Sequence, residues 1–264
     1  MRGHLIVDVP LIAAAVSLAP VYGWLPLAYI TGIATGLHTW GVINPRSSLY
    51  MPVWWRLPRD CPDVALTFDD GPHPEVTPRL LDLLAAHQQH ATFFLIGENV
   101  RRYPAVVRRM IAEGHSIGLH SDRHSWAFNC WPPHLVRRDL KRCSASIADV
   151  TGQAAPILFR PPVGLKNPIV GFVVGQLGLR TVTWSCRGLD TGNSPVDVIV
   201  ERIQNGLQPR GILTLHDGHE PTRPKDRSNC LAVMEKIMPL LQERKLISRA
   251  LIPATKGITV RSDV

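Results

Sequence analysis

Two adjacent carboxylates, Asp69 and Asp70, end an apolar run in the segment VALTFDDGPHP, residues 64–74. A short apolar run bounded by Gly and Pro is typical of a buried strand. Adjacent side chains of a strand point to opposite faces, so the strand must end at this pair if both carboxylates are to face one cleft. An isolated Asp-Asp-Gly sequence is more often a solvated turn. A chemical role for the pair therefore depends on residues elsewhere in the chain.

Further polar side chains follow other predicted strands. They are His120 and His124 after one strand, Arg160 after the next, then Asp190 and finally His216. The carboxyl ends of parallel strands meet at one edge, where such folds gather their sites. Two imidazoles four residues apart and one carboxylate give three protein ligands and leave positions open for water and substrate, as a hydrolytic zinc site requires. An isolated pair of histidines carries little weight, but together with the Asp-Asp turn and a further histidine it predicts a metal site.

From Val64 onward, strand patterns alternate with helix patterns. After the opening strand, we predict strands at 91–97, 115–121, 156–162, 179–186 and 211–218, with one more within 245–251. Apolar residues at helical spacing predict helices at 77–89, 104–114, 134–152, 167–178, 195–206 and 231–245. Such alternation is typical of a parallel sheet that crossover helices close, or nearly close, into a barrel.

The N-terminal part of the chain has a different composition. Residues 5–43 contain only Asp8 and His38 as acidic or basic side chains. At about 1.5 Å per residue, this length is roughly twice what one helix needs to cross a bilayer core of about 30 Å. We therefore predict a transmembrane segment or a helical hairpin, with helices near 5–21 and 25–43. A signal peptide is the competing interpretation, but the apolar stretch is too long and no convincing cleavage site follows it.

These patterns divide the chain into four segments. They are a membrane anchor at 1–45, a Pro- and Trp-rich junction at 46–62, a catalytic barrel at 63–252 and a C-terminal tail at 253–264. In the junction, Trp54 and Trp55 suit either a membrane interface or the base of the barrel. Positive charges flank the apolar pair on the outside, which favours a bacterial-type inner membrane with the catalytic domain in the cytoplasm. If only one helix spans, that domain faces the periplasm or the cell exterior.

Charge and cysteine content narrow the class of partner. The formal net charge is +8, but the lysines and arginines are scattered and no aromatic residues alternate with them, so we expect no nucleic acid partner. An anionic membrane surface fits this charge better. The five cysteines are an odd number without a CxxC pair, which favours reduced, structural cysteines and a reducing compartment.

Four segments together resemble the motifs of a known family. TFDDGPHPEVTPRLLDLL, EGHSIGLHSDRH, FRPPVG and ILTLHDG, in this order and spacing, are similar to those of the polysaccharide deacetylases, carbohydrate esterase family 4 with its NodB-homology domain. The resemblance covers about residues 60–250. It implies a distorted (β/α) barrel and the metal-dependent removal of an acyl group, usually acetyl, from an amino sugar.

The resemblance also implies roles for individual residues. Asp70, His120 and His124 match the metal ligands, and Asp69 matches the general base. His216 matches the general acid. The metal implied is a divalent cation, with Zn²⁺ expected and Co²⁺ or Ni²⁺ as alternatives, because such a ligand set accepts several transition metals.

Supporting roles follow from the same motifs. Arg160 would orient the base through a charged hydrogen bond, and Asp190 would pair with the general acid and keep it protonated. An ordinary salt bridge and a surface loop acid are the alternative interpretations of these two residues. The expected oxyanion and substrate contacts are Pro161, Pro162 and the backbone NH near Val163.

The chain departs from the family pattern around the expected cleft. Several motif positions differ from the family pattern. Asp122, Arg123 and Ser125 stand where an aromatic residue, a Thr and a Pro are usual, Val163 stands for a Tyr after Arg-Pro-Pro, Arg187 stands where an acid is frequent, and Thr191 stands for the Trp after Asp190. The aromatic surfaces that hold a long glycan are therefore reduced. We expect a substrate that carries a phosphate or another anion, such as a lipid-linked sugar, instead of a long neutral chitin chain.

Two other classes of function remain open at this stage. The same metal site could serve a deformylase or an O-deacetylase, which only substrate profiling separates from an N-deacetylase. A membrane-anchored glycan-binding protein with an inactive site is the other alternative, although every expected ligand and base is present. The expected partners are a glycan or glycolipid substrate and membrane lipid, and the sequence makes no prediction of oligomeric state.

Overall fold

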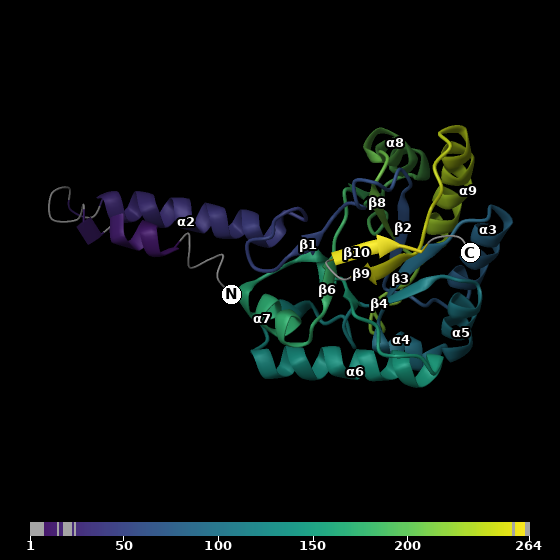
Figure 1. Cartoon of the computed structure of the whole chain (residues 1–264), viewed down its shortest axis with the longest axis horizontal. Coiled ribbons are helices and arrows are strands. Elements are labelled where there is room, and N and C mark those ends of the chain that lie inside the picture. The colour runs from purple at the N-terminus through teal and green to yellow at the C-terminus, as the bar shows by residue number, and fades with distance from the viewer. Residues whose placement is uncertain (1–7, 15, 18–22, 24, 255–256, 262–264) are drawn as a thin grey trace.

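The structure is a computed structural model that describes residues 8–14, 16–17, 23, 25–254 and 257–261. Its centre is an eight-stranded sheet in the order β1-β6-β5-β4-β3-β2-β8-β7, in which every neighbouring pair is parallel. The sheet curls into a half-barrel with helices packed around it (Figure 1). The described part of the chain therefore has the curled (β/α) architecture that the alternating pattern predicts.

The strands of this sheet are short. Their bounds are β1 Val53–Trp54, β2 Ala65–Asp69, β3 Ala91–Leu95, β4 Ser116–Leu119, β5 Leu158–Phe159, β6 Arg180–Val182, β7 Cys186–Arg187 and β8 Ile212–His216. The α-helices are α2 Leu25–Ile43, α3 Val76–Ala86, α4 Gly97–Arg102, α5 Pro104–Ala112, α6 Pro133–Thr151, α7 Pro168–Gln176, α8 Val196–Gly206 and α9 Ser228–Glu243. Two 3₁₀ turns are η1 Trp126–Cys130 and η2 Pro162–Gly164.

The central strand β2 shows how the sheet separates two layers of apolar side chains. Leu66 and Phe68 belong to a large cluster that includes the inner faces of the helices, whereas Ala65 belongs to a smaller cluster on the opposite face. Side chains alternate along a strand, so Thr67 and Asp69 share the face of Ala65. The inner face of the barrel is thus apolar at the start of β2 and polar at its carboxyl end.

The segment predicted as one strand at 179–186 is two strands in the structure. β6 pairs with β5 and β1, whereas β7 pairs with β8 at the other edge of the sheet. One continuous strand cannot pair with both edges of an open barrel, so the chain leaves the sheet at residues 183–185 and rejoins it. Trp184, in this crossing segment, lines a cavity of the domain.

The C-terminal segment also differs from the prediction. The expected tail at 253–264 begins inside an antiparallel hairpin of β9, Leu251–Ala254, and β10, Gly257–Val260. Leu251 and Ile258 are buried in the smaller apolar cluster inside the barrel. The hairpin covers that end of the barrel because these apolar side chains are removed from water there.

The N-terminal residues form helices where they are described. Residues 8–14 and 16–17 are helical and lie beside α2, and together they project from the domain near β1 and α7 (Figure 1). Asp8 Oδ1 lies 2.7 Å from His38 Nε2, so the acidic and the basic side chain of this segment pair with each other. The second predicted helix, 25–43, coincides with α2, and the first is described only in part. No helix within the described ranges combines the length and the apolarity that crossing a membrane requires.

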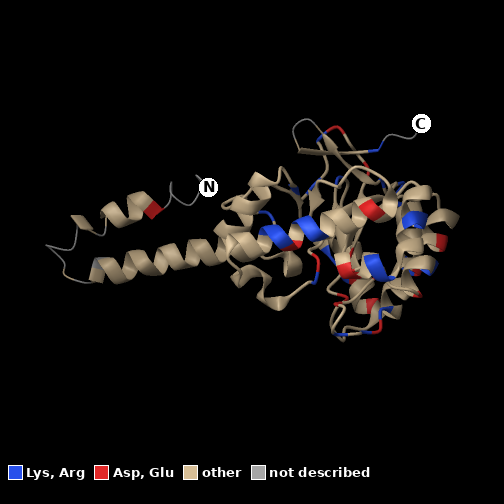
Figure 2. Cartoon of the chain, turned by 90° about the horizontal axis from the view of Figure 1, so that it is seen from below, with Lys and Arg blue, Asp and Glu red and all other residues tan. Residues whose placement is uncertain are grey.

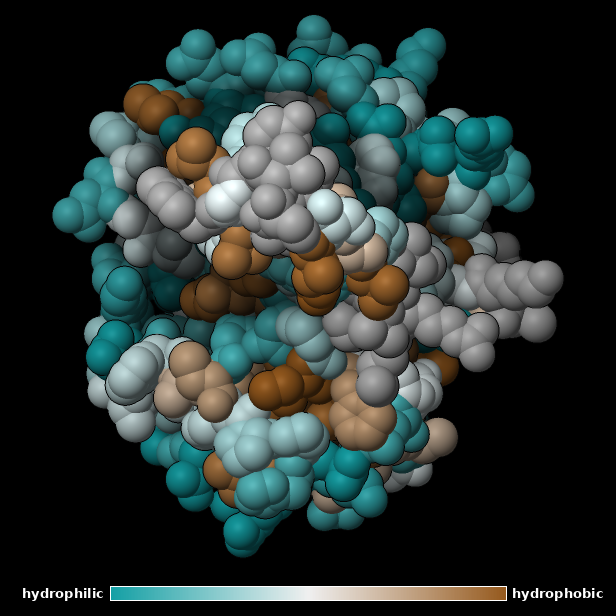
Figure 3. Space-filling model, turned by 90° about the vertical axis from the view of Figure 1, so that its left-hand side faces the viewer, coloured by the Kyte–Doolittle hydropathy of each residue, from teal (hydrophilic) through white to brown (hydrophobic). Residues whose placement is uncertain are grey.

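Apolar side chains are exposed along this pair of helices. More than a third of the surface of each of these residues is accessible: Val9, Ile12, Val16, Leu25, Leu27, Tyr29, Ile33, Leu37, Trp40 and Ile43. The described part of the pair carries no Lys or Arg (Figure 2). Seen from this end, hydrophobic side chains gather around the projection and hydrophilic ones surround them (Figure 3). An exposed apolar surface of this kind is typical of an interaction site.

Candidate active site

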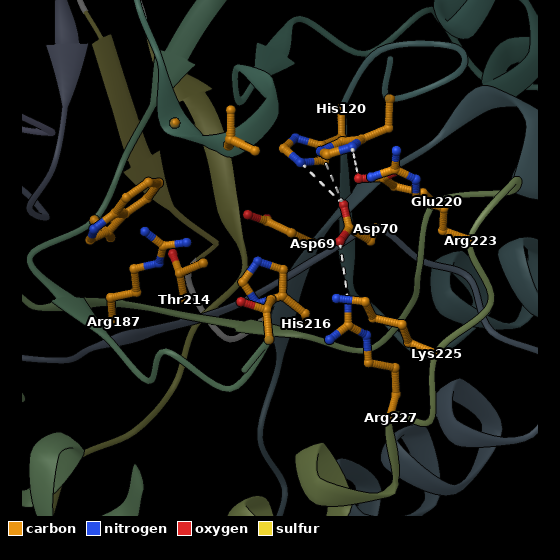
Figure 4. Close-up of a pocket in the computed structure, with 15 residues that line it drawn as sticks. Asp69, Asp70, His120, Arg187, Thr214, His216, Glu220, Arg223, Lys225 and Arg227 are labelled. Atoms are coloured by element: carbon orange, nitrogen blue, oxygen red, sulfur yellow. Dashed lines mark ion pairs between the residues drawn. The ribbon is translucent and has the colours of Figure 1, made fainter. Parts of the chain in front are cut away.

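The turn after β2 brings both carboxylates of the Asp-Asp pair to one side. β2 ends at Asp69, and Asp70 adopts a left-handed backbone conformation with φ of 69°. This conformation changes the direction of the chain, and Asp tolerates it better than most residues. The peptide bond between Gly71 and Pro72 is cis. Both carboxylates are buried and line one cavity of about 210 Å³ (Figure 4).

Asp70, His120 and His124 form a compact group of possible metal ligands. One ligand atom from each residue lies within 4.8 Å of the others. Oδ1 of Asp70 is 3.4 Å from Nε2 of each histidine, and it is buried without a hydrogen-bond partner among the described residues. A buried carboxylate oxygen facing two imidazole nitrogens requires a compensating cation or proton. The group therefore fits a divalent metal.

The ring nitrogens that face away from Asp70 have different surroundings in the two histidines. Nδ1 of His120 lies 2.9 Å from the backbone carbonyl oxygen of Arg160, and Nδ1 of His124 lies 3.4 Å from Oε1 of Glu220. The acceptor at Nδ1 of His120 holds the proton there and leaves the Nε2 lone pair free for a metal. The buried Nδ1 of His124 makes no hydrogen bond to the described residues, and burial lowers the pKa of this imidazole, which favours its neutral form.

Asp70 is held in its charged form. Burial alone would raise its pKa, but the neighbouring imidazoles, His124 foremost, outweigh burial and lower it below the usual range. On its other side, Oδ2 of Asp70 lies 3.6 Å from the guanidinium of Arg227, which is itself buried. The carboxylate thus directs one oxygen toward the histidines and the other toward a fixed positive charge.

Asp69 is oriented by a fully buried arginine. Nη1 of Arg160 donates to Asp69 Oδ1 at 2.7 Å and to the hydroxyl of Thr67 at 2.8 Å. The remaining nitrogens of the guanidinium donate to the carbonyl oxygens of Val182 and Thr183. The expected contact between Arg160 and the carboxylate is thus present, and it is the charge-assisted kind.

The pairing of β2 with β8 places the two proposed acid–base groups side by side. Asp69 is the register partner of His216, and both lie at the carboxyl ends of their strands. Oδ1 of Asp190 lies 2.9 Å from Nδ1 of His216, and Oδ2 accepts the backbone NH of the same residue at 2.8 Å. Burial alone would lower the pKa of His216, but the charge and hydrogen bond of Asp190 raise it above the ordinary value. The imidazole therefore remains protonated at a higher pH than a free histidine.

Replacement of Asp190 by Asn should change the pH dependence of the reaction. A general acid works only when protonated, so with His216 in this predicted role activity should fall as pH rises through the pKa of its imidazole. Because Asp190 raises that pKa, the Asp190→Asn variant should lose activity at lower pH than the wild type does. The deficit should grow with pH toward the roughly 10²-fold that such a group contributes. Profiles of kcat/KM against pH for both proteins measure this; superimposable alkaline limbs would contradict it.

The loop after β5 matches the expectation only in part. Val163 is 55% exposed, lines the cavity and has a left-handed φ of 50°, which is strained for a β-branched residue. Pro161 and Pro162, expected as substrate contacts, are buried and are not among the residues that line the cavity. Gly164 continues the loop directly against Trp184, where a Cβ atom would have no room. Val163 and Gly164, and not the two prolines, therefore form the part of this loop that lines the cavity.

Several lining residues were not anticipated from the sequence. They are Trp184 and Thr214, together with Glu220, Arg223, Lys225 and Arg227 from the loop between β8 and α9. The last four follow directly after the ILTLHDG motif, and the run of charges in HEPTRPKDR was the available signal. Asp122, in contrast, is buried and does not line the cavity. Its Oδ1 lies 2.6 Å from Nη1 of Arg101. Its departure from the family pattern therefore has a structural role.

The comparisons with known proteins agree with this geometry. The sequence model of the polysaccharide deacetylase family matches residues 56–182. The peptidoglycan-N-acetylglucosamine deacetylase of Bacillus cereus is 36% identical over 194 residues, which is 73% of this chain and 87% of the relative. The chain belongs to the polysaccharide deacetylase family. The motif resemblance of the sequence is thus confirmed.

Other members of the family are similar over the same part of the chain. A chitooligosaccharide deacetylase from a Bradyrhizobium species is 36% identical over 187 residues, covering 69% of this chain and 85% of the relative. A solved structure of peptidoglycan N-acetylglucosamine deacetylase shares 28% identity with a TM-score of 0.68, covering 75% of this chain and 90% of that one. The prediction of a deacetylase-type hydrolase of carbon–nitrogen bonds other than peptide bonds is confirmed by these family members.

Proposed function

We propose that this polysaccharide deacetylase is a divalent-metal-dependent enzyme that removes an N-acyl group, acetyl above all, from an amino sugar of a glycan or a lipid-linked saccharide. The observation that supports it is the convergence of Asp69, Asp70, His120, His124 and His216 on one cavity. The relatives named for deacetylation of N-acetylglucosamine and chitooligosaccharides support the same reaction class.

In this proposal, Asp70, His120 and His124 hold the metal, with Zn²⁺ as the first candidate. Bound there, a divalent cation would supply a Lewis acid that makes water more acidic and polarises a carbonyl. Asp69, aligned by Arg160, takes a proton from the water that attacks the acyl carbon. The backbone NH near Val163 donates to the oxygen on which negative charge develops.

His216 completes the reaction. Its protonated imidazole gives its proton to the amide nitrogen as the carbon–nitrogen bond breaks, which releases the amino sugar and the carboxylate of the acyl group. Asp190 stabilises the imidazolium before this transfer. The base, Asp69, and the acid, His216, are register partners on adjacent strands. Each can therefore exchange a proton with the reacting amide over a short distance, one from each side of it.

The assay that tests this proposal compares metal-free and metal-loaded protein on N-acetylated amino-sugar oligomers. Chelation should abolish release of acetate, and addition of Zn²⁺, Co²⁺ or Ni²⁺ should restore it, because the three ligands remain in place. Release of formate from N-formylated oligomers, or of acetate from O-acetylated ones, with no release from the N-acetylated oligomers would identify a deformylase or an O-deacetylase. Loaded protein that binds oligomers without releasing any acid would be the inactive glycan-binding protein, and would refute the proposal.

We also propose that the helical pair formed by residues 8–14 and 16–17 together with α2 contacts lipid at the bacterial cytoplasmic membrane, with the catalytic domain on the cytoplasmic side. The exposed apolar side chains of the pair and the net charge of +8 support contact with an anionic bilayer. Flotation of the full chain with phosphatidylglycerol vesicles tests the contact, and protease accessibility in intact cells tests the side. A chain that stays unbound at low salt would contradict lipid contact.

A further inference from the structure

Four cationic side chains line the cavity: Arg187, Arg223, Lys225 and Arg227. Two of them already lie near carboxylates of the same cavity. Nη2 of Arg227 is 3.6 Å from Oδ2 of Asp70, and Nε of Arg223 is 3.9 Å from Oε2 of Glu220. Within the described ranges, Arg187 and Lys225 have no such ion pair. Nε of Arg187 is buried and has no hydrogen-bond partner among the described residues. A buried guanidinium nitrogen without an acceptor is costly unless a ligand supplies one.

Arg187 lies next to the proposed general acid. It is on β7, where its register partner on β8 is Thr214, two residues before His216 and on the same face. Its guanidinium lies over the ring of Trp184 at 5.1 Å, which limits its movement. In Figure 4, Arg187 and Thr214 lie on one side of His216, and the other three cations lie across the cavity.

The charge of the cavity is unsuited to a neutral substrate. Its four cations face three carboxylates, and a bound divalent cation would add two further positive charges. A neutral amino sugar would leave this excess positive charge uncompensated in a partly enclosed site. A phosphate matches it, because a guanidinium binds phosphate oxygens with two parallel hydrogen bonds.

The apolar helical pair is attached to the domain near the side of the cavity where Arg187 lies. Lys166, which is fully buried, donates from Nζ to the carbonyl oxygen of Asn44 at 2.7 Å, and its backbone NH donates to Val42. Two residues earlier in the same loop, Gly164 packs directly on Trp184, and the guanidinium of Arg187 lies over the ring of that tryptophan. The base of the helical pair is thus connected to Arg187 through a short chain of contacts.

We propose that the substrate is an N-acylated amino sugar joined to a phosphate, and that Arg187 binds this phosphate on the sugar side of the scissile amide. The inference rests on the proposed function, since His216 marks where the sugar nitrogen must lie. Arg223 and Lys225 add a positive field from across the cavity. The attachment of the apolar helical pair beside Arg187 favours a phosphate that is part of a polyprenyl carrier.

The experiment compares three probes with the metal-loaded full chain: polyprenyl-phosphate-linked N-acetylglucosamine, UDP-N-acetylglucosamine and the neutral oligomer chitotetraose. Arg187→Gln should reduce kcat/KM on the phosphate-bearing probes by about 10- to 100-fold, mainly through KM, as expected for a lost charged hydrogen bond. The reduction on chitotetraose should be much smaller. Arg108→Gln is the matched control, because it removes one positive charge from an exposed position on α5.

The outcomes separate this inference from the proposed function. Equal losses on charged and neutral probes, or turnover of chitotetraose without turnover of either phosphate-bearing probe, would overturn the inference and leave the deacetylase intact. Absence of acetate release from every probe would refute both. A preference for the polyprenyl probe over the nucleotide sugar would identify a lipid carrier as the source of the phosphate, and the reverse preference would identify a soluble one. A thermal unfolding curve of Arg187→Gln that overlays the wild type excludes misfolding as the cause of any loss.

Discussion

Asp69→Asn should lower kcat by about 10²- to 10⁴-fold while the protein keeps its metal. The substitution preserves the shape of the side chain and removes only its ability to accept the proton of the attacking water. Asp70 and both histidines remain in place, so metal content should not change. Initial rates at saturating metal and elemental analysis of the same samples measure the two quantities separately.

The matched control for this variant is Asp82→Asn. Asp82 is largely exposed and pairs with Arg109 on the surface, so the same chemical change there should leave the rate within about twofold. If Asp69→Asn retained wild-type activity, another group would have to be the base. If it lost metal together with activity, Asp69 would be a ligand, and the division of roles within the pair would be wrong.

Arg160→Met should destabilise the protein by about 3–5 kcal/mol, in addition to lowering its activity. The variant leaves Asp69 buried without its charged partner, and Thr67 and the carbonyl oxygens of Val182 and Thr183 lose their donor. An uncompensated buried charge is among the most costly changes in a protein interior. Urea denaturation of the metal-free proteins measures the free energy of unfolding without a contribution from the metal.

Arg102→Met provides the comparison for the loss of stability. Arg102 pairs with Glu98 at 2.5 Å, but almost half of its side chain is exposed, so this variant should cost no more than about 1 kcal/mol. Similar costs at the two positions would show that burial of Arg160 does not govern the strength of its pair. Should Arg160→Met fail to fold, Arg160→Lys keeps the charge but lacks the planar set of donors, and its stability should lie between the other two.

Local patterns predicted most of the sheet and the centre of the site. β2, β3, β4 and β8 lie within the predicted strands because apolar runs bounded by turn residues identify buried strands. The acidic and imidazole side chains meet because each follows a strand end, and parallel strands share one edge. This part of the site could be predicted without knowing which distant residues contact each other.

The parts that the sequence did not predict depend on such distant contacts. The division of 179–186 into β6 and β7 follows from pairing with opposite edges of the sheet, which no local pattern encodes. The loop that supplies Glu220 and Arg227 has the sequence of an ordinary solvated loop, and only the fold brings it to the cavity that the proposed metal ligands line. The strands of the hairpin after residue 250 are short, and no local pattern shows that they cover the barrel interior. Their apolar side chains are buried only because the folded barrel provides that interior.

The left-handed backbone at Asp70 limits which substitutions this position can accept if a descendant loses its catalytic activity. Few residues other than Gly, Asn and Asp adopt that conformation at low cost, and the surrounding turn is buried. His120 has no such restriction, since its backbone φ is negative. A descendant that abandons catalysis is therefore expected to change the histidine to many residue types, but to pass first through Asn or Gly at position 70. Inactive relatives with this turn should carry that signature long after the metal is lost.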